Sequence, residues 1–554
     1  MTNSDIADIL KHYADLYELH DGNPFKVKQF VSASFRVDKM GVTLFGKSLE
    51  ELEKTEGLNK GLAAKIFEIC STGSFADLND LLANTPEGVI QIMRIKGIGP
   101  KKVAHIWKEL GIESIGELLY ACKENRLAQA KGFGLKSQLN VIKEIEFIFA
   151  SANKFHYAKL EPIANLLIND LQKHISSIKQ ISMSGDMRRR CEVIERIQIT
   201  ASVTNREEAI DSISQQPLFS SVLANDNGLS GNYGGHPFDL IMCDDSEFVY
   251  QLFLNTASQE HLEQLGKLPH IIQNLTKENE VYAALNMQYI EPEMREGRGE
   301  VEKAKSHSLP KLIELSDLKG PLHNHSKWSD GLFTIEEMAK QCMSKSYQYL
   351  GMGDHSKSAF YANGMKEFQI IEQHKEIDAL NAKYPAFKIF KGIECDILYD
   401  GSMDYENDVL ASFDYVVASV HSILKMTEEK AMQRLIGAIE NPYTSILGHP
   451  TGRLLLMREG YPIDHKKMID ACVANRVVIE INANPYRLDL DWRWIDYSLN
   501  KGAMLSINPD AHDLDGFADM YFGTLVARKG GLTKEHCLNA MNVDELKAYF
   551  NSII

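Results

Sequence analysis

The spacing of apolar positions divides this chain into three parts. Over residues 1–150 apolar side chains recur every three or four positions, as in DIADILKHYADLYEL and GLAAKIFEIC, which predicts helices joined by glycine turns. Residues 151–315 alternate short apolar runs, such as RIQITASVT and PFDLIMC, with helical stretches, which predicts an α+β region. The charged segment EPEMREGRGEVEKAKSH at its end indicates a connection between domains.

From residue 318 onward, short apolar runs are each followed by a helical pattern. Seven such runs end near Leu322, Gly353, Ile393, Val420, Gly448, Ile481 and Ile507. Neighbouring run ends are about 26 to 40 residues apart, which is close to the length of one strand and one helix. This alternation predicts a parallel α/β barrel of about seven or eight strands.

Side chains that can bind metals follow six of these seven runs. The candidate ligands are His323, His325, Asp330, His355, Glu394, His421, His449, Asp510 and His512. Because the carboxyl ends of the strands carry the active site in such barrels, we expect the nine side chains to converge. Nine ligands are too many for one tetrahedral zinc ion. They fit two or three divalent ions, Mn²⁺, Zn²⁺ or Fe²⁺, that share a bridging carboxylate.

Metals clustered in this way generate hydroxide at neutral pH and stabilise a phosphoryl centre, so the pattern predicts a phosphoesterase. The candidate catalytic residues are Glu394, His449, Asp510 and Arg453, the last as a phosphate contact. Arg487 and Lys327 are further candidates for phosphate contacts. For each of these three basic residues, an ordinary surface ion pair is the alternative.

A short repeat occurs three times in the N-terminal region, as GLNKGLAAKI from Gly57, GIGPKKVAHI from Gly97 and GFGLKSQLNVI from Gly132. The last two copies have the Gly-apolar-Gly form that is typical of a helix-hairpin-helix motif. Its glycines let backbone amides at a helix start point toward a phosphate. The candidate DNA contacts are Gly97, Gly99, Lys101, Lys102, Gly132, Gly134 and Lys136. They favour DNA-backbone binding without sequence readout, and plain helix connectors are the alternative.

Composition qualifies these predictions. The 554 residues carry a formal net charge of −16, which as a bulk value argues against nucleic-acid binding. Residues 91–150 nevertheless hold ten basic against six acidic side chains, so this segment can still bind phosphate. We find no apolar stretch of membrane-spanning length, no secretory signal pattern and no CxxC pair among the eight cysteines. We therefore expect a reduced, cytoplasmic, monomeric protein.

Several of these segments resemble a known family. LHNHSKWSDG, GDHS, GIECDI, DYVVASVHS, LGHPTGRLL and INPDAH are similar to motifs of the polymerase and histidinol phosphatase (PHP) domain. The resemblance implies a distorted seven-stranded barrel, and all nine positions of that family's metal pattern are occupied here. NPFKVKQF, the hairpin repeats, MREGRGEVE and HPTGRLL occur in the order of bacterial family-X DNA polymerases with a C-terminal PHP domain, which the whole chain resembles.

That resemblance implies four regions. They are a helical DNA-binding domain (1–90), a helix-hairpin-helix domain like the polymerase fingers (91–150), a palm and thumb (151–315) and the PHP domain (318–554). In the first region, Lys65 falls where animal family-X enzymes have a lysine that forms a Schiff base with deoxyribose phosphate. We favour the alternative of an exposed helix lysine, because lyase chemistry needs a desolvated amine.

The palm motif departs from the family pattern. Family-X polymerases have Gly-Ser, then Arg-Arg, then an Asp-x-Asp pair that holds two magnesium ions, whereas this chain reads GDMRRRCEVIERIQIT from Gly185. Asp186 stands at the serine, and Arg196 and Gln198 stand at the acidic pair. Only a third family aspartate remains, as Asp239. One carboxylate cannot hold two Mg²⁺ ions, so we expect a degenerate polymerase core that keeps its fold and lacks its activity.

Two further features bear on this expectation. The Thr-Gly-Ser turn of the family's nucleotide pocket appears here as Thr256-Ala257-Ser258. The alternative to an inactive core is that Glu192 or Glu195 replaces a lost ligand, although the spacing of these acids does not restore the pair.

The resemblance implies an enzyme that processes DNA ends in repair. The hairpins and the inactive core would hold gapped, nicked or primer-template DNA while the PHP site acts as a 3′–5′ exonuclease, with abasic-site cleavage or 3′-phosphate removal as further activities. One alternative is an active gap-filling DNA polymerase with PHP proofreading. The other is a non-catalytic DNA-binding scaffold, against which the open, ligand-rich rim argues, because structural zinc sites are closed and use four ligands.

Overall fold

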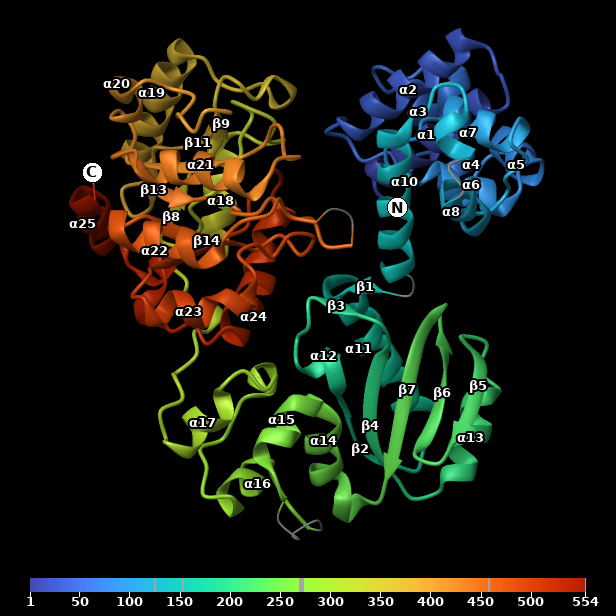
Figure 1. The fold of residues 1–554 in the computed structure, drawn as a ribbon, viewed down its shortest axis with the longest axis vertical. Coiled ribbons are helices and arrows are strands. Elements are labelled where there is room, and N and C mark those ends of the chain that lie inside the picture. Colours follow the sequence, from blue (N-terminus) through green and yellow to red (C-terminus); the bar gives the residue numbers. More distant parts are fainter. Residues whose placement is uncertain (124–125, 152–153, 269–273, 457–458, 554) are drawn as a thin grey trace. The chain divides into compact units, whose positions relative to one another are not determined.

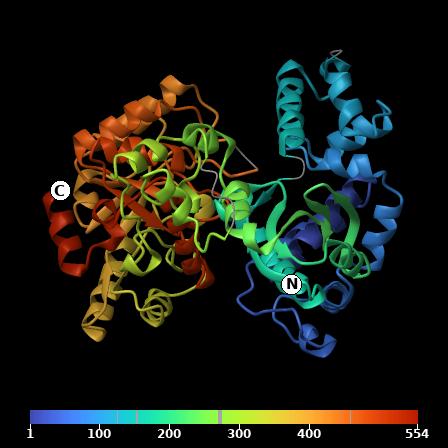
Figure 2. The same cartoon turned by 90° about the horizontal axis from the view of Figure 1, so that it is seen from below.

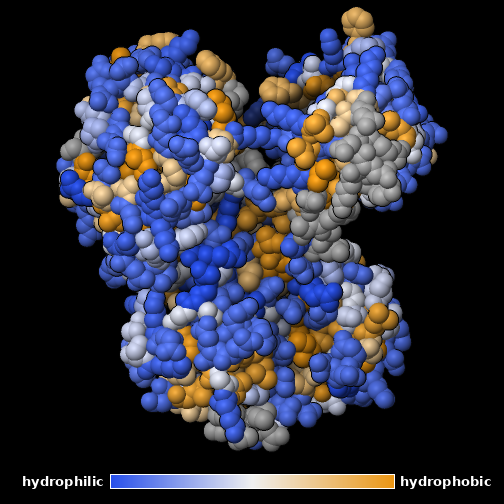
Figure 3. Space-filling model, in the orientation of Figure 1, coloured by the Kyte–Doolittle hydropathy of each residue, from blue (hydrophilic) through white to orange (hydrophobic). Residues whose placement is uncertain are grey.

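The computed structural model describes residues 1–123, 126–151, 154–268, 274–456 and 459–553, and the chain forms two compact units, 1–152 and 153–554 (Figure 1). Each unit has its own buried apolar core. The face drawn in Figure 3 is mostly hydrophilic, with hydrophobic residues in small groups. Among the described residues, no helix combines the length and apolar character needed to cross a membrane.

The secondary structure described in the first unit is helical, as predicted. The helices are α1 (Asn3–Leu19), α2 (Pro24–Asp38), α3 (Leu49–Glu53), α4 (Lys60–Thr72), α5 (Ala76–Ala83), α6 (Glu87–Met93), α7 (Pro100–Lys108), α8 (Ile115–Lys123), α9 (Arg126–Gln129) and α10 (Leu135–Ser151). One apolar core joins helices from both halves of this unit, and Leu10, Ile66, Ile106 and Ile145 are all fully buried in it.

The second unit begins with an α+β region, which also agrees with the prediction. Its sheet has the order β2-β4-β7-β6-β5, with β4 and β7 parallel and the other pairs antiparallel. The strands are β2 (Ile178–Met183), β4 (Ile197–Val203), β5 (Phe219–Asn225), β6 (Gly228–Tyr233) and β7 (His236–Cys243). A separate pair joins β1 (Phe155–His156) to β3 (Val193–Ile194).

The helices of this region pack on the sheet or form a separate small core that leads to the C-terminal region. They are α11 (Tyr157–His174), α12 (Gly185–Arg188), α13 (Arg206–Ser214), α14 (Phe248–Thr256), α15 (Gln259–Leu265), α16 (Asn279–Ala284) and α17 (Glu300–Lys305). Leu160 and Leu167 of α11 pack against the sheet with Ile199 of β4. The register of β4 and β7 places Gln198 beside Asp239, so two positions of the palm motif are neighbours.

The C-terminal region contains a parallel sheet of the order β15-β14-β13-β12-β11-β9. The strands are β9 (Asp354–His355), β11 (Gly392–Asp396), β12 (Tyr415–Ser419), β13 (Thr444–Leu447), β14 (Val478–Asn482) and β15 (Leu505–Asn508), and β8 (Tyr349–Gly351) pairs with β10 (Lys388–Phe390). The helices are α18 (Ile335–Ser344), α19 (Glu367–Lys383), α20 (Asn407–Leu410), α21 (Glu428–Ile439), α22 (His465–Asn475), α23 (Ile495–Asn500), α24 (Met520–Lys529) and α25 (Val543–Ile553). Figures 1 and 2 show the longer helices outside these strands.

Six of the seven apolar runs form strands, although the run ending near Gly353 forms β8 of the two-stranded pair, with β9 directly after it in the larger sheet. The first run, ending near Leu322, forms none of the named strands. Its segment instead hydrogen bonds to both edges of the sheet. Gly353 N–H donates to Asn324 O and His325 N–H donates to Ala511 O, both at 2.8 Å. This segment makes only the isolated bridge from Asn324 to Ala511 among the described residues. β10 is an additional strand that the sequence pattern did not predict.

Candidate metal centre and nucleic-acid interface

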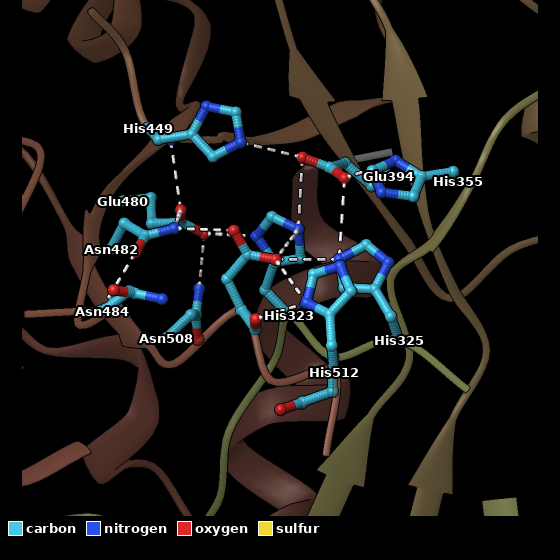
Figure 4. A network of polar contacts seen from close by, with 12 residues as sticks. His323, His325, His355, Glu394, His449, Glu480, Asn482, Asn484, Asn508 and His512 are labelled. Carbon is cyan, nitrogen blue, oxygen red and sulfur yellow. Dashed lines mark hydrogen bonds and ion pairs between the residues drawn. The ribbon is translucent and has the colours of Figure 1, made fainter. Parts of the chain in front are cut away.

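The nine predicted ligands lie at the carboxyl ends of the parallel strands. His355 ends β9, Glu394 lies within β11, and His421 and His449 follow β12 and β13 by two residues. The remaining ligands are His323 and His325 on the segment between the sheet edges, Asp330 shortly after it, and Asp510 and His512 after β15. Figure 4 shows that the labelled histidines of this set point toward Glu394 and one another.

The donor atoms of these residues form three overlapping groups, in each of which they lie within 4.8 Å of one another. The groups are His325, Asp330, His355 and His512; His323, His325 and Asp510; and His355, Glu394 and His421. The ninth predicted ligand, His449, places Nε2 3.0 Å from Glu394 Oε1. Each group offers the mixed nitrogen and oxygen ligands, without thiolate, that suit Zn²⁺, Mn²⁺ or Fe²⁺.

Unpartnered atoms show that these side chains fit a metal. Among the described residues, neither His323 Nε2 nor His325 Nδ1 takes part in a hydrogen bond, although both atoms are buried. His323 Nε2 lies 3.2 Å from Glu394 Oε1. Buried polar atoms without partners are costly, and a cation held between them removes that cost.

Protonation within the cluster also suits metal binding. Burial would raise the pKa of Glu394, but His421 and His323 lower it well below its usual value, so the carboxylate is ionised. Burial, His512 and His355 together lower the pKa of His325 to about 3, which leaves a neutral imidazole. Burial would lower the pKa of His421, but Glu394 and Asp396 raise it to about 10. A metal bound by His421 would therefore displace a proton.

Two buried carboxylates that our sequence analysis did not single out orient these histidines. Glu480 Oε2 lies 2.8 Å from His323 Nδ1, and Asp396 Oδ1 lies 2.7 Å from His421 Nδ1. Glu480 Oε1 also accepts a hydrogen bond of 3.1 Å from the backbone N–H of His449. The available signal was a charged residue inside the fully buried strand VIEIN. Carboxylates at the far nitrogen of a metal-binding histidine fix its ring orientation.

The basic residues proposed as phosphate contacts differ in their surroundings. Arg453 is engaged within the protein, because Nε donates to Arg487 O at 3.0 Å and Nη1 pairs with Asp491. Arg487 is half-buried, and Lys327 is exposed between the ligands His325 and Asp330. Of the three, Lys327 is the side chain most open to a substrate.

The three hairpin repeats share one backbone form. Gly57, Gly97 and Gly132 have φ values of +86°, +89° and +84°, a region that favours glycine. In each copy the next helix begins three residues later. Asn59 caps α4 in the first copy with its side chain, whereas Gly99 precedes α7 without a side-chain cap. The amides at the start of α7 are therefore not occupied by a capping side chain, as binding to phosphate requires.

The lysines of the second hairpin lie at an open hollow of about 740 Å³. Its lining includes Lys101, Lys102, Lys108, Lys131 and Phe133. Lys101 is 83% exposed, and Lys102 Nζ lies 5.2 Å from the centroid of the Phe133 ring. Lys136 is exposed on the first turn of α10. Lys101 and Lys102 of α7 and Lys136 of α10 lie in the first turns of their helices, where a DNA phosphate would bind.

The altered positions of the palm motif contact one another. Arg196, just before β4, donates from Nη1 to both carboxylate oxygens of Asp239 at 2.7 and 2.9 Å. Gln198 Oε1 accepts a hydrogen bond of 3.3 Å from the backbone N–H of Asp186. Both oxygens of the Asp239 carboxylate are therefore bound by the Arg196 guanidinium.

The neighbouring charged residues are engaged as well. Arg188 pairs with Glu278 at 2.6 Å. Glu192 accepts hydrogen bonds from Trp492 Nε1 and Arg493, at 3.1 and 2.9 Å. Glu195 is exposed on the surface. Glu192 is thus held by partners in the C-terminal region, and the exposed Glu195 pairs with Lys154 at 3.8 Å.

Lys65 is paired with an acid in the first unit. Its Nζ lies 2.8 Å from Asp77 Oδ2 and 4.8 Å from the centroid of the Phe75 ring. Lys65 in turn lowers the pKa of Asp77. The amine that Schiff-base chemistry would need is therefore engaged by a carboxylate of the same unit.

Comparison with known proteins agrees with this arrangement region by region. The chain matches the helix-hairpin-helix domain over residues 1–75, the SAM-like helix-hairpin-helix tandem over 89–146 and the PHP domain over 321–484. Fold and site together define a DNA-binding enzyme with a PHP domain of the nuclease or phosphatase type.

The chain is 33% identical to the DNA polymerase/3′-5′ exonuclease PolX of Bacillus subtilis (strain 168), over 99% of each protein. It belongs to the bacterial family-X DNA polymerases with a C-terminal PHP domain. Probable phosphatases of Thermoanaerobacter sp. (strain X514) and Acetivibrio thermocellus are 27% and 26% identical. Those alignments cover 41% and 30% of this chain, and 92% and 65% of the two phosphatases.

Proposed function

We propose that this protein is a metal-dependent phosphodiesterase that removes nucleotides from DNA 3′ ends through its PHP site. The observation that carries the proposal is the convergence of nine His, Asp and Glu side chains around the buried carboxylate of Glu394. The Bacillus relative, which is named a 3′-5′ exonuclease, supports the direction of cleavage. A role in DNA repair at gaps, nicks or primer ends follows from this activity.

The residues of the site divide the chemical work. Two or three ions of Mn²⁺, Zn²⁺ or Fe²⁺ would supply activated hydroxide and neutralise charge on the phosphoryl oxygens. Glu394 would help to hold these ions, together with His449, whose Nε2 lies 3.0 Å from Glu394 Oε1. Asp510 holds His325 in place, because its Oδ1 lies 2.9 Å from His325 Nε2. Lys327 would offer a positive charge to the next phosphate along the strand.

The hairpins of the first unit would hold DNA through its backbone phosphates, without reading the bases. The open amides of α7, the exposed charges of Lys101 and Lys136 and the half-buried Lys102 suit backbone phosphates. We assign residues 1–90 and 91–150 to DNA binding, 151–315 to a palm and thumb, and 318–554 to phosphodiester hydrolysis.

The polymerase core would help to bind DNA but would not add nucleotides. Arg196 pairs with Asp239, and Arg188, next to the altered serine position, pairs with Glu278. A fixed cation at the remaining acid repels Mg²⁺, and an engaged arginine is less able to bind a triphosphate.

One gel tests this function against its alternatives. A 5′-labelled primer-template is incubated with the protein and Mn²⁺, with and without the four deoxynucleotides. We expect shortening in both reactions. Extension when nucleotides are present would support an active polymerase, and an unchanged primer would support a non-catalytic scaffold. Labelled DNA with an abasic site or a 3′-phosphate, run beside it, tests the two further activities.

A further inference from the structure

We propose that Glu192 of the palm is a positioning residue for the PHP site, acting through the loops that follow β13 and β14. The inference rests on the proposed nuclease function. It explains how a palm that does not transfer nucleotides could still support hydrolysis by the PHP domain.

Glu192 is joined to the PHP domain by two hydrogen bonds. Its Oε2 accepts from Trp492 Nε1 at 3.1 Å, and its Oε1 accepts from Arg493 Nη1 at 2.9 Å. Glu192 and Trp492 are 8% and 5% exposed. A buried carboxylate with charged and neutral donors holds its partners in one geometry, and removing either side leaves polar groups unsatisfied.

Arg493 extends this contact toward the metal ligands. Its guanidinium also lies 2.9 Å from Asp491 Oδ2, and Asp491 pairs with Arg453. Arg453 is four residues after the ligand His449. A continuous set of polar contacts therefore links the palm to the loop that carries His449.

The two loops are also tied to each other beside the site. Thr451 donates to Asp489 Oδ2 from both its backbone N–H and its hydroxyl, each at 2.9 Å. Arg453 Nε donates to Arg487 O at 3.0 Å. Because of these bonds, a displacement of the loop after β14 would be transmitted to the loop after β13.

A second palm residue contacts the same pair of loops. His156 Nε2 lies 2.9 Å from Leu455 O, and its ring lies edge-on to Tyr486 with centroids 4.7 Å apart. Leu455 N–H donates to Tyr486 O at 2.7 Å. The region of residues 154–315 therefore contacts these two loops through His156 as well as through Glu192.

The surface that carries Glu192 is itself anchored. Lys529 of α24 has a fully buried side chain that donates to Arg189 O at 3.0 Å and pairs with Glu296. Arg189 also pairs with Glu296, at 3.0 Å. A buried lysine satisfied in this way fixes the palm segment that ends at Glu192 against the PHP domain.

The test uses Glu192→Ala and Glu192→Gln in the full chain, with Glu195→Gln as the matched exposed control. Hydrolysis of bis(p-nitrophenyl) phosphate with Mn²⁺ reports the PHP site without a contribution from DNA binding. We expect kcat to fall about 10-fold in Glu192→Ala and less in Glu192→Gln, which can still accept from Trp492, with little change in KM. The control should match the wild-type protein.

Two further measurements separate positioning from general destabilisation. The single variant Arg493→Gln should also lower kcat. Combining it with Glu192→Gln should lower kcat little further, because both changes break the same contact. Hydrogen exchange is measured on both proteins below their unfolding temperatures. In Glu192→Ala it should be faster than in the wild type for peptides that contain Leu455 and Thr451, and unchanged for peptides of α18.

The outcomes distinguish this inference from the proposed function. A wild-type protein that hydrolyses neither the small diester nor DNA would refute the nuclease, and the exchange measurement would still decide whether Glu192 holds the loops. An active wild-type protein with unchanged kcat and unchanged exchange in Glu192→Ala would refute the positioning role. A loss of stability with unchanged kcat would also refute it.

Discussion

Arg196 donates from one guanidinium nitrogen to both carboxylate oxygens of Asp239, at 2.7 and 2.9 Å. The contact joins two positions at which the sequence analysis placed the family's acidic metal ligands. If that assignment holds, Asp239 faces a positive charge where a polymerase would hold Mg²⁺. This pair gives a structural reason to expect no nucleotide addition.

We expect the His323→Ala variant, whose nuclease cannot erase extension products, to add no nucleotide to a primed template with Mg²⁺ or Mn²⁺. Adding Arg196→Asp and Gln198→Asp should restore Mn²⁺ binding to the palm in part, measured by calorimetry against His323→Ala alone. Rescue of synthesis should stay incomplete, because Asp186 and Ala257 still disfavour the nucleotide. Extension by the His323→Ala protein itself would show that another acid holds the metal.

The hairpins should carry most of the affinity for gapped DNA. We expect Lys101→Glu with Lys102→Glu to weaken binding equally for unrelated sequences and to reduce its salt dependence, because each phosphate contact contributes a slope of about −0.9 to the log–log plot. Fluorescence anisotropy between low and high salt measures both effects. Lys340→Glu with Lys375→Glu, two exposed lysines of the PHP domain, is the charge-matched control. Equal affinity in the two double variants would show that the repeat serves only packing.

Glu480 should tune metal affinity without binding the metal. Glu480→Gln removes the charge 2.8 Å from His323 Nδ1 while keeping the side chain's volume. We expect Mn²⁺ affinity to fall about 10- to 100-fold. Titration with Mn²⁺, followed by nuclease activity and by calorimetry, measures the loss. Unchanged affinity would show that the backbone alone orients His323.

Asp519 should make stability depend on pH. Burial and the neighbouring Asp513 raise its pKa to about 7, from 3.8. The folded protein then holds this proton more tightly, so the free energy of unfolding falls as pH rises from about 4 to about 7 and is level above. We expect Asp519→Asn to be more stable than the wild type by on the order of 2 kcal/mol at pH 8, and by less at pH 5.

Thermal unfolding at the two pH values checks this prediction, with the exposed Asp515→Asn as the control. If the difference in unfolding free energy between the wild type and Asp519→Asn were the same at pH 5 and pH 8, the pKa of the Asp519 carboxyl would not be raised.

The metal ligands could be predicted from sequence because the alternation of strands and helices fixes where the carboxyl ends of parallel strands lie. His355, Glu394, His421 and His449 each follow or end a recognisable apolar run, and the structure brings them together. The strand expected at Leu322 did not form, and the segment makes an isolated bridge through Asn324 instead. Apolar spacing predicts strands well where the run is long, and poorly where ligands interrupt it.

The supporting residues could not be predicted in the same way. Glu480 stands inside an apolar strand, and its role depends on where His323, 157 positions earlier in the sequence, places its ring. Glu192 and Arg493 meet across 301 positions, in segments with no shared periodicity. Such contacts depend on how the folded elements pack against one another, so the pattern of residues along the sequence does not predict them.

The most direct test of this account compares the wild-type protein with His323→Ala plus His325→Ala on 3′-tailed and gapped DNA in Mn²⁺. We expect the double variant to lose 3′–5′ degradation while its DNA affinity stays within about twofold, because the hairpins lie in the other unit. Degradation that persists in the double variant would contradict the assignment of the nuclease to the PHP site.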